Sequence, residues 1–280
     1  MKRKRKSPFI RYFDKTPPGI VCPHYYLLAH ANGCPYECAY CYLSLTFRQK
    51  KCEWFTNLGD MEGDLRAWLF GVGEPSLLSA GELADSLAID STWFQVAYRL
   101  FTGPANPIGH TLLLVTKSEA TELLEYEPHP SVVVSFSVNA ESMASKHERG
   151  APSPKLRLDA AAELKRRGWR IRLRLDPMLP CSNWREAYLP TVKRIAEIQP
   201  ERVTLGSLRY FPSLPRYHPD FPSMPVKRDG PDGRYRLPYS LRIEMYEFVR
   251  EHLNMPFGLC KETDALHAAV KPDPRCNCTL

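Results

Sequence analysis

The sequence has 280 residues, of which 44% are hydrophobic and 25% charged, and a formal net charge of +7 at pH 7. It has no apolar run near the roughly 20 residues of a membrane helix, which excludes a membrane-spanning chain, and it has no apolar signal core. Nine cysteines in such a chain favour metal or redox chemistry over a disulfide framework. We therefore expect a cytoplasmic protein without a membrane partner.

The N-terminal region is strongly basic. Five of the first six residues are Lys or Arg, so a disordered tail over residues 1–20 accounts for much of the net charge. The charge is then weak evidence for a nucleic-acid partner. We expect the main domain over residues 21–210. Residues 211–280, which are rich in proline and contain three cysteines, are predicted to form a C-terminal extension packed on it.

Apolar runs predict the strands in chain order. Tyr25–His30 is rich in aromatic residues and predicts a first strand, and Leu77–Leu78 is a candidate second strand. A helix is predicted over residues 91–101. The continuous apolar runs over 111–116 and 132–136 predict strands that are buried on both faces of a parallel sheet.

The second half of the chain continues this alternation. Ser153 and Pro154 predict the N-cap and first residue of a helix that ends at Gly168. Arginines alternate with apolar residues over 170–175, which predicts a fifth strand covered on one face only. Six strands in this βα order predict an α/β fold, a partial and open (β/α)6 barrel with a C-terminal extension. The remaining elements are expected at 184–198 (helix, with Pro190 able to begin a second segment), 202–206 (sixth strand), 241–253 (helix) and 257–260 (closing strand).

Three cysteines follow the first strand. Cys34, Cys38 and Cys41 lie four and three residues apart in the loop Gly33–Tyr42. Thiolates are the soft ligands of iron–sulfur clusters, and three of them on a short loop can bind three irons of a cubane and leave the fourth iron free for a small molecule. A zinc site would need a fourth ligand. The spacing therefore predicts a 4Fe-4S cluster at the end of this strand.

The Cys-x3-Cys-x2-Cys loop and the aromatic Tyr42 after it resemble the radical S-adenosylmethionine (SAM) superfamily. The resemblance implies a partial barrel, a 4Fe-4S cluster on the three cysteines, and SAM bound at the open iron. It also implies reductive cleavage of SAM to a 5'-deoxyadenosyl radical that abstracts hydrogen from a substrate. Tyr42 resembles the aromatic that lies near the adenine in this superfamily, and packing under the loop explains a tyrosine here about as well.

Polar segments after the next three strands are candidates for cofactor contacts. The segment 81–90 offers acceptors for the methionine ammonium of SAM. Lys117 follows the third strand, and hydroxyl and amide groups that suit ribose recognition follow the fourth. Each signal is weak alone, and their shared location at strand ends strengthens them together. The predicted cofactor-binding residues are Tyr42, Glu82, Asp85, Ser86, Lys117, Ser137 and Asn139.

These segments narrow the resemblance to the spore photoproduct lyase family, also described as DNA repair photolyase-like. Besides the cysteine loop, the matching features are Asp85-Ser86, Ser-x-Ser-x-Asn at 135–139, Glu148–Ser153 and Asp176–Met178. The match spans most of residues 25–210. It implies that Lys117 and Ser137 contact the cofactor and that the substrate is nucleic acid.

Arg209 and Tyr210, after the sixth strand, resemble the Arg-aromatic pair that this family uses near its thymine-dimer lesion. An arginine can grip phosphate and a tyrosine ring can stack on a base. A surface arginine beside a core tyrosine is an equal alternative. Arg172 and Arg174 are interpreted as solvated or salt-bridged side chains rather than ligands.

The chain departs from the family at the hydrogen-transfer step. The family's lyase has a cysteine just before the Asp-Ser segment that returns a hydrogen atom to the substrate radical, and residues 80–82 contain none here. Either another thiol such as Cys22, Cys52 or Cys181 reaches the site, or the overall reaction is not lesion reversal.

Cys260, Cys276 and Cys278 form a second group of cysteines near the C-terminus. They are candidates for a second cluster or a zinc site with a fourth ligand from elsewhere, and Cys276 and Cys278 for a redox pair. Reduced thiols without metal are the simplest alternative.

The sequence thus predicts a radical SAM enzyme with a 4Fe-4S cluster and SAM as cofactors, an electron donor such as flavodoxin or ferredoxin, and a nucleic-acid substrate. One alternative is a radical SAM enzyme that acts on a small molecule, peptide or protein. The other is a non-catalytic zinc or iron–sulfur binding module.

Overall fold

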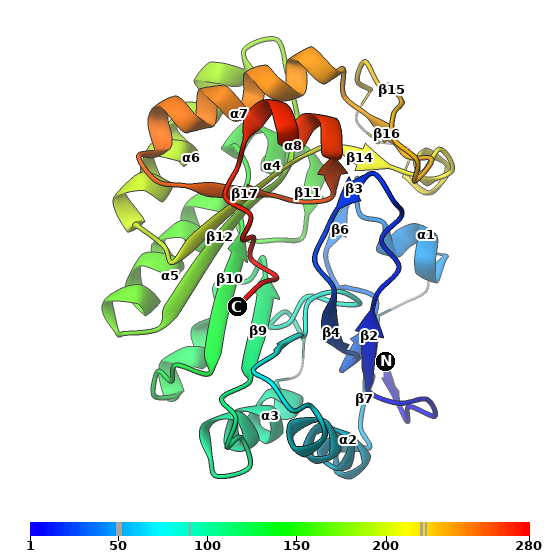
Figure 1. Ribbon diagram of the computed structural model, residues 1–280, viewed down its shortest axis with the longest axis vertical. Helices are drawn as coiled ribbons and strands as arrows, with labels where there is room; N and C mark the ends of the chain where they lie inside the picture. The colour runs from blue at the N-terminus through cyan, green and yellow to red at the C-terminus, as the bar shows by residue number, and fades with distance from the viewer. Residues whose placement is uncertain (49–51, 90, 219–220, 222) are drawn as a thin grey trace.

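The computed structural model describes residues 1–48, 52–89, 91–218, 221 and 223–280, and a curved sheet of eight strands organises this part of the chain (Figure 1). The six predicted strands are parallel neighbours in chain order, a seventh extends them in parallel, and an antiparallel strand closes the other edge. The predicted α/β fold is confirmed. In sheet order the strands are β17 (Phe257–Leu259), β13 (Arg202–Ser207), β12 (Arg170–Met178), β10 (Val132–Ser137), β9 (Thr111–Thr116), β8 (Leu77–Ser79), β4 (Tyr25–Leu28) and β2 (Ile10–Phe13).

Alternating side chains explain why the central strands are apolar throughout. Leu112 and Leu114 of β9 belong to the main core with the helices, whereas Leu113 belongs to a smaller interior cluster with Val133 and Tyr25. Successive side chains of a strand point to opposite faces. A continuous apolar run therefore satisfies the helix-covered face and the interior face together, as predicted for β9 and β10.

Helices pack against one face of the sheet. Ser153 accepts a hydrogen bond from the Leu156 N–H at 3.3 Å and Pro154 is the first residue of α5, as predicted. Helix α6 continues through Pro190, so no second segment begins there, because Pro190 is exposed and water can satisfy the carbonyl that it leaves unpaired. Within the described ranges, every helix is too short or too polar for a membrane span. The α-helices are α1 (Leu43–Phe47), α2 (Leu58–Gly71), α3 (Thr92–Thr102), α4 (Glu141–His147), α5 (Pro154–Arg166), α6 (Trp184–Ile198), α7 (Tyr239–Leu253) and α8 (Asp264–Val270), with 3-10 turns at Thr121–Glu125 and Leu214–Tyr217.

Residues near the N-terminus pair with the core. Strand β2 runs antiparallel to β4, and β1 (Lys2–Arg3) pairs with β7 (Glu53–Phe55). Phe9 is buried, and its N–H donates to the Asp64 carboxylate at 2.7 Å. A disordered tail is therefore wrong for these residues, because their apolar side chains and backbone groups have partners in the core. The remaining short strands are β3 (Ile20–Val21), β5 (Ala31–Asn32), β6 (Glu37–Cys38), β11 (Glu148–Arg149), β14 (Arg209–Tyr210), β15 (Lys227–Arg228), β16 (Tyr235–Arg236) and β18 (Glu262–Thr263).

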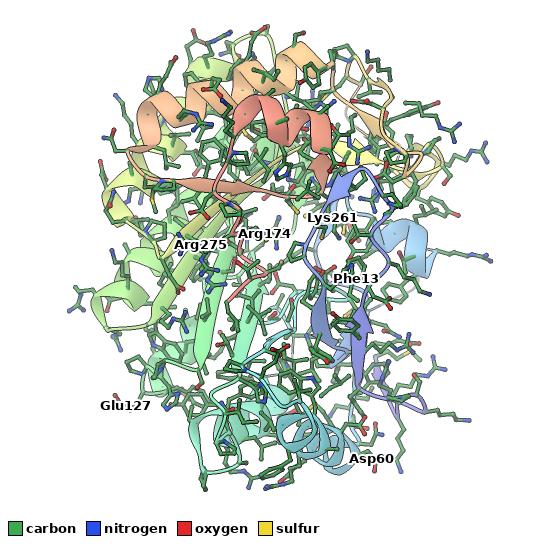
Figure 2. The ribbon with its side chains drawn as sticks, in the orientation of Figure 1. Phe13, Asp60, Glu127, Arg174, Lys261 and Arg275 are labelled. Atoms are coloured by element: carbon green, nitrogen blue, oxygen red, sulfur yellow. The ribbon has the colours of Figure 1, made fainter. Side chains whose placement is uncertain are left out.

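The C-terminal tail, residues 275–280, begins at Arg275 (Figure 2), lies along the sheet and ends beside its central strands (Figure 1). The buried Asn277 side chain donates to Ser135 Oγ at 2.7 Å and to the Leu173 carbonyl at 3.1 Å, and it accepts from Thr204 Oγ1 at 2.7 Å. These bonds join the tail to β10, β12 and β13. A Cβ atom at Gly258 would lie 2.3 Å from the Arg275 carbonyl oxygen, so glycine is required where the tail passes β17.

This tail also covers the second face of β12. Arg172 is fully buried, and its guanidinium donates to the Asn277 carbonyl at 2.8 Å and pairs with Glu201 at 2.9 Å. The prediction that β12 is covered on one face only is therefore wrong, while the salt-bridged interpretation of Arg172 is confirmed. The division between a core at 21–210 and an extension at 211–280 stays a prediction.

Candidate active site

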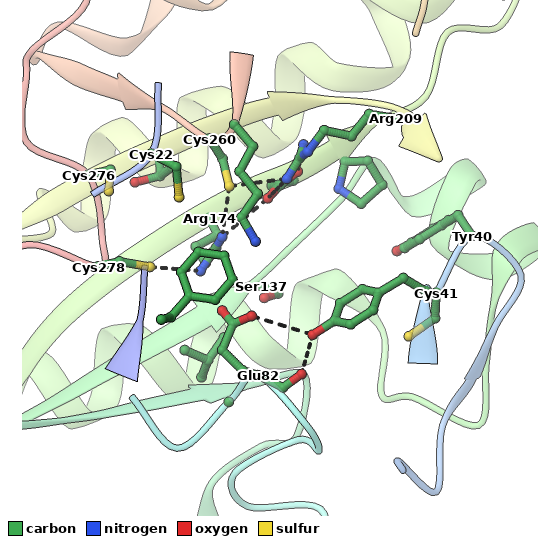
Figure 3. A pocket seen from close by; sticks show the side chains of 18 of the residues that line it. Cys22, Tyr40, Cys41, Glu82, Ser137, Arg174, Arg209, Cys260, Cys276 and Cys278 are labelled. Atoms are coloured by element: carbon green, nitrogen blue, oxygen red, sulfur yellow. Dashed lines mark hydrogen bonds and ion pairs between the residues drawn. The ribbon is translucent and has the colours of Figure 1, made fainter. Parts of the chain in front are cut away.

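A cavity of about 440 Å³ lies at the carboxyl ends of the parallel strands (Figure 3). Its walls come from the ends of β9, β10 and β12, the loop after β8, the cysteine loop and the C-terminal tail. Parallel α/β folds place their functional groups at these strand ends. The predicted site residues that line the cavity are Cys41, Tyr42, Glu82, Lys117, Ser137, Arg209, Tyr210, Cys260, Cys276 and Cys278.

A buried ion pair anchors the cysteine loop. The Tyr40 hydroxyl donates to the Glu148 carboxylate, which lies 2.6 Å from Arg157 Nη1. The same nitrogen donates to the Ser137 carbonyl at 3.0 Å, and Cys38 pairs with Glu148 where β6 meets β11. Because a single charge left in the interior is costly, this network holds its geometry only with both partners present. The sequence identified the Glu148 motif but gave it no role.

The loop thiols have surroundings that suit an iron–sulfur cluster. Burial raises the pKa of Cys34 to about 12, while its sulfur accepts two backbone N–H groups, one of them from Asp85. Burial also raises the pKa of Cys41, whose sulfur accepts the Leu43 N–H and lies near the Lys117 ammonium. These donors and this charge stabilise the thiolate form that iron binds. All three loop thiols are free.

The described residues include no group of three or more His, Cys, Asp or Glu side chains that could hold a metal ion. A zinc site needs four ligands around one ion. Zinc therefore has no support from the geometry, either at the loop or at Cys260, Cys276 and Cys278. A cubane does not need this convergence, because each cysteine binds a different iron. The loop thus fits a cluster, and metal binding by the second group stays a prediction without geometric support.

Asp85 and Ser86 fix the loop after β8 and do not line the cavity. The Asp85 carboxylate accepts from the Thr116 hydroxyl at 2.7 Å and the Lys117 N–H at 2.6 Å. Ser86 Oγ accepts from the Val115 N–H at 2.9 Å. Both side chains therefore hold the β8 loop against the end of β9, and a direct contact of either with SAM has no support.

Glu82 and Lys117 place opposite charges in the cavity. The Tyr42 hydroxyl donates to the Glu82 carbonyl and lies 3.4 Å from its carboxylate. Burial raises the pKa of Glu82, but the Lys261 charge and hydrogen bonds from tyrosine hydroxyls lower it by a larger amount. The net pKa of Glu82 therefore falls below its usual value. The Lys117 ammonium lies 5.9 Å from the centre of the Tyr40 ring, on the side of the cysteine loop. A zwitterionic ligand would find both charges here.

Ser137 lines the cavity at the end of β10, whereas Asn139 does not. The buried Asn139 amide donates to the Pro177 carbonyl at 3.1 Å and accepts from the Tyr188 hydroxyl at 2.6 Å. Its polar atoms therefore join β10, β12 and α6. A ribose contact by Asn139 has no support.

Arg209 lines the cavity with its guanidinium already paired (Figure 3). Its Nη1 lies 2.8 Å from Asp176 Oδ1, and Arg174 lies 3.2 Å from the other oxygen, which confirms Arg174 as salt-bridged. Burial disfavours ionised Asp176, but the two guanidiniums hold its pKa well below the usual range. A Cβ atom at Gly206 would lie 2.3 Å from Asp176 Oδ1, so glycine makes room for this carboxylate.

The Tyr210 ring is committed to packing. Its centre lies 4.5 Å from that of Phe221 and 5.8 Å from that of Tyr235. The neighbouring Phe211 is 37% exposed, with the Arg234 guanidinium 4.8 Å from its ring centre, and both line the cavity. Sequence reasoning missed this second pair, because nothing local distinguishes it within a proline-rich segment.

Of the three thiols suggested for the missing cysteine, Cys22 lines the cavity. Cys52 instead donates to the Gly33 carbonyl at 3.1 Å, and Cys181 lies 3.4 Å from Asn183 Oδ1, away from the cavity lining. The group at Cys260, Cys276 and Cys278, which the sequence did not connect with this step, lines the cavity together with Cys22.

The comparison with protein families decides the relationship. A family model for spore photoproduct lyase matches residues 13–208, well over half of the chain. The chain belongs to the spore photoproduct lyase family. The match ends before the C-terminal extension that supplies three of the cavity thiols. The spore photoproduct lyase of Geobacillus sp. (strain Y412MC61) is 26% identical to this chain over 201 residues. These residues cover 71% of this chain and 57% of the relative. The chain thus spans little more than half of the relative's length.

Solved structures share the fold. Spore photoproduct lyase complexed with dinucleoside spore photoproduct has a TM-score of 0.74 at 18% identity, over 92% of this chain and 80% of that one. A spore photoproduct lyase mutant with bound AdoMet and dinucleoside spore photoproduct has a TM-score of 0.72 at 17% identity. The match covers 92% of this chain and 80% of that one. Streptococcus suis SuiB bound to S-adenosylmethionine gives 0.57 at 11%, over 87% of this chain and 51% of that chain. These similarities concern the fold and confirm the partial barrel.

Proposed function

We propose that this chain is a radical SAM enzyme acting on nucleic acid. The observation that carries the proposal is that Cys41 of the cysteine loop lines the same cavity as Glu82, Lys117 and Ser137. Cys34, Cys38 and Cys41 would hold a 4Fe-4S cluster, which would bind SAM at its open iron and supply the electron for reductive cleavage of SAM. The family membership of residues 13–208 supports this assignment.

The chain's own residues would bind and orient the cofactor. The ionised Glu82 is a suitable acceptor for the methionine ammonium, and Lys117 is a suitable partner for its carboxylate. Ser137 offers a hydroxyl at the end of β10. The apolar walls, including Leu27, Val115 and Leu259, limit water in the cavity. A confined site of this kind keeps a reactive species from side reactions.

The proposed substrate is DNA with a thymine lesion. Solved relatives hold a dinucleoside spore photoproduct. Phe211 and Arg234, which line the cavity, offer a partly exposed ring and a cation, the two features that bind bases and backbone. Arg209 would act mainly by holding Asp176. A flavodoxin or ferredoxin is the proposed electron donor, and the cytoplasm is the proposed location because such clusters need reducing conditions.

Anaerobic reconstitution with iron and sulfide tests the enzyme assignment, with about four irons expected per chain. Dithionite and SAM should then yield 5'-deoxyadenosine. Dinucleoside spore photoproduct is the substrate probe, and its conversion to thymine units is expected. Zinc without labile sulfide would support a binding module instead. Cofactor cleavage without conversion of the probe, together with no salt-dependent binding to DNA, would favour a small-molecule or peptide substrate.

A further inference from the structure

One wall of the cavity carries four thiols from three separate parts of the chain (Figure 3). Cys22 follows β3, Cys260 follows β17, and Cys276 and Cys278 belong to the C-terminal tail. All four are free. Figure 3 shows this group across the cavity from Cys41. Side chains that converge from such distant segments form a surface that faces whatever the cavity holds.

The thiols differ in their partners. The Cys278 sulfur accepts a hydrogen bond from Arg174 Nη1 at 3.7 Å. Cys260 accepts from Arg174 Nη2 at 3.3 Å and from Arg209 at 3.1 Å. These guanidinium contacts favour the thiolate forms of Cys278 and Cys260, which leaves Cys276, on the same cavity wall and two positions before Cys278, as the protonated thiol.

Electrostatics agree with this assignment. The neighbouring Cys276 side chain is the main cause that lowers the pKa of Cys278 to about 6, with burial opposing this shift and Arg174 assisting it. The Cys278 side chain and burial raise the pKa of Cys276 well above its usual value. The two shifts agree with the guanidinium contact of Cys278, which favours a thiolate there and an S–H group on Cys276.

A hydrogen donor is needed in this cavity, and residues 80–82 cannot supply one. They contain no cysteine, and a Cβ atom at Gly81 would lie 2.3 Å from Val115 Cβ, which leaves no room for a side chain. An S–H bond is weaker than a ribose or methyl C–H bond, so a thiol can quench a carbon radical. The described cavity lining offers Cys276 as the S–H group with a thiolate beside it.

We propose that Cys276 and Cys278 act together as the hydrogen-atom donor to carbon radicals formed in the cavity. The inference rests on the proposed radical function. Cys276 gives its hydrogen atom, one proton and one electron, so that a C–H bond forms and the S–H bond breaks. The resulting thiyl radical bonds to the Cys278 thiolate, which gives a disulfide radical anion. One electron then passes to an iron–sulfur electron carrier and leaves a Cys276–Cys278 disulfide, which an external thiol reduces.

The first test follows deuterium in the reconstituted full-length protein, with SAM and dithionite in D2O and no substrate. Thiol hydrogens exchange with solvent, whereas carbon-bound hydrogens of the protein do not. The native chain should place deuterium in 5'-deoxyadenosine, and Cys276→Ser should lose most of it per molecule of 5'-deoxyadenosine formed. Cys181→Ser is the matched control, because this thiol does not line the cavity.

The outcomes separate this inference from the proposed function. If the native chain forms no 5'-deoxyadenosine, the proposed function fails. If the native chain and Cys276→Ser form 5'-deoxyadenosine with the same deuterium content, the donor assignment fails while the function stands. If Cys22→Ser loses the deuterium and Cys276→Ser keeps it, the assignment of Cys276 and Cys278 as the donor is likewise overturned.

The second test needs neither cluster nor SAM. Cluster-free protein is treated with oxidised glutathione, its remaining thiols are alkylated, and it is digested with trypsin. Cleavage after Arg275 releases residues 276–280, which contain both thiols. The expected peptide carries an internal disulfide and has lost two hydrogen atoms. A peptide with both cysteines alkylated, or with separate glutathione adducts, would contradict a paired donor.

Discussion

The two cysteine-rich segments of this protein hold their thiols in different ways. The loop at Cys34–Cys41 offers backbone N–H groups to its sulfurs, and a nearby ammonium assists. In the tail at Cys276–Cys278, the Cys278 sulfur instead accepts a hydrogen bond from the Arg174 guanidinium. Backbone N–H groups leave the loop sulfurs without a side-chain cation bonded to them, whereas a guanidinium already contacts the Cys278 sulfur. This difference matches the two proposed roles, which are iron binding for the loop and hydrogen-atom transfer for the tail.

The iron content of matched variants should differ most between the two segments. Cys38→Ala removes one of three proposed cluster ligands, so we expect complete loss of bound iron, sulfide and 5'-deoxyadenosine formation. Cys278→Ala should keep the iron, because its sulfur contacts Arg174 instead. Iron and sulfide analysis after anaerobic reconstitution measures both. A tail variant that also loses iron would make the tail a cluster ligand.

Removal of the loop's anchor should have the next largest effect. Glu148→Ala leaves Arg157 as an unpaired charge in the interior, which should lower the free energy of unfolding by about 3–5 kcal/mol. Urea denaturation measures this change in the free energy of unfolding. Glu163→Ala is the control, because its bonds to Arg166 and Arg167 lie at the surface, where solvent screening leaves ion pairs with little effect on stability. Similar losses in both variants would refute the anchoring role.

The tail's attachment can be tested separately. Asn277→Ala removes side-chain hydrogen bonds to Ser135, Leu173 and Thr204 and should cost about 1–3 kcal/mol. It should also speed alkylation of Cys276. Asn183→Ala is a fair comparison, because Asn183 is exposed and makes no capping bond from its side chain. Unchanged alkylation in Asn277→Ala would mean that this residue does not hold the tail.

A smaller effect is expected in thiol reactivity. The thiolate is the form that reacts with iodoacetamide, so the relative rate at Cys278 should rise with pH through about 6. Burial raises the pKa of Cys22, so its rate should rise only above the usual thiol range. Peptide mass spectrometry after brief labelling at several pH values distinguishes the two. Parallel profiles would contradict the electrostatic difference between Cys278 and Cys22.

The parts of the fold that follow local patterns were predictable. The strands at 111–116 and 132–136 and the cap at Ser153 come from residues adjacent in sequence. The cysteine loop is equally local. Asp85 and Asn139 were harder, because a carboxylate or amide looks the same in sequence whether it faces a cavity or satisfies buried backbone groups.

The position of the C-terminal tail on the sheet could not be predicted from the sequence, for a physical reason. Asn277 contacts Ser135, which is 142 positions away in the chain, and no periodic pattern reports such a contact. Its position also explains the wrong prediction for β12, since alternating arginines normally mark a solvated face. Here the tail's carbonyl oxygens and Glu201 replace water around Arg172. Long-range polar contacts therefore determine that both faces of β12 are covered, and the local sequence pattern does not report them.

The short tail offers a chemical handle on the cavity. Both paired thiols fall within residues 276–280, and Arg275 before them has an exposed side chain. A synthetic pentapeptide could therefore be ligated to a chain that ends at Arg275, with selenium in place of either sulfur. Such a semisynthetic protein would introduce a single spectroscopically distinct atom into the cavity wall without altering any other side chain.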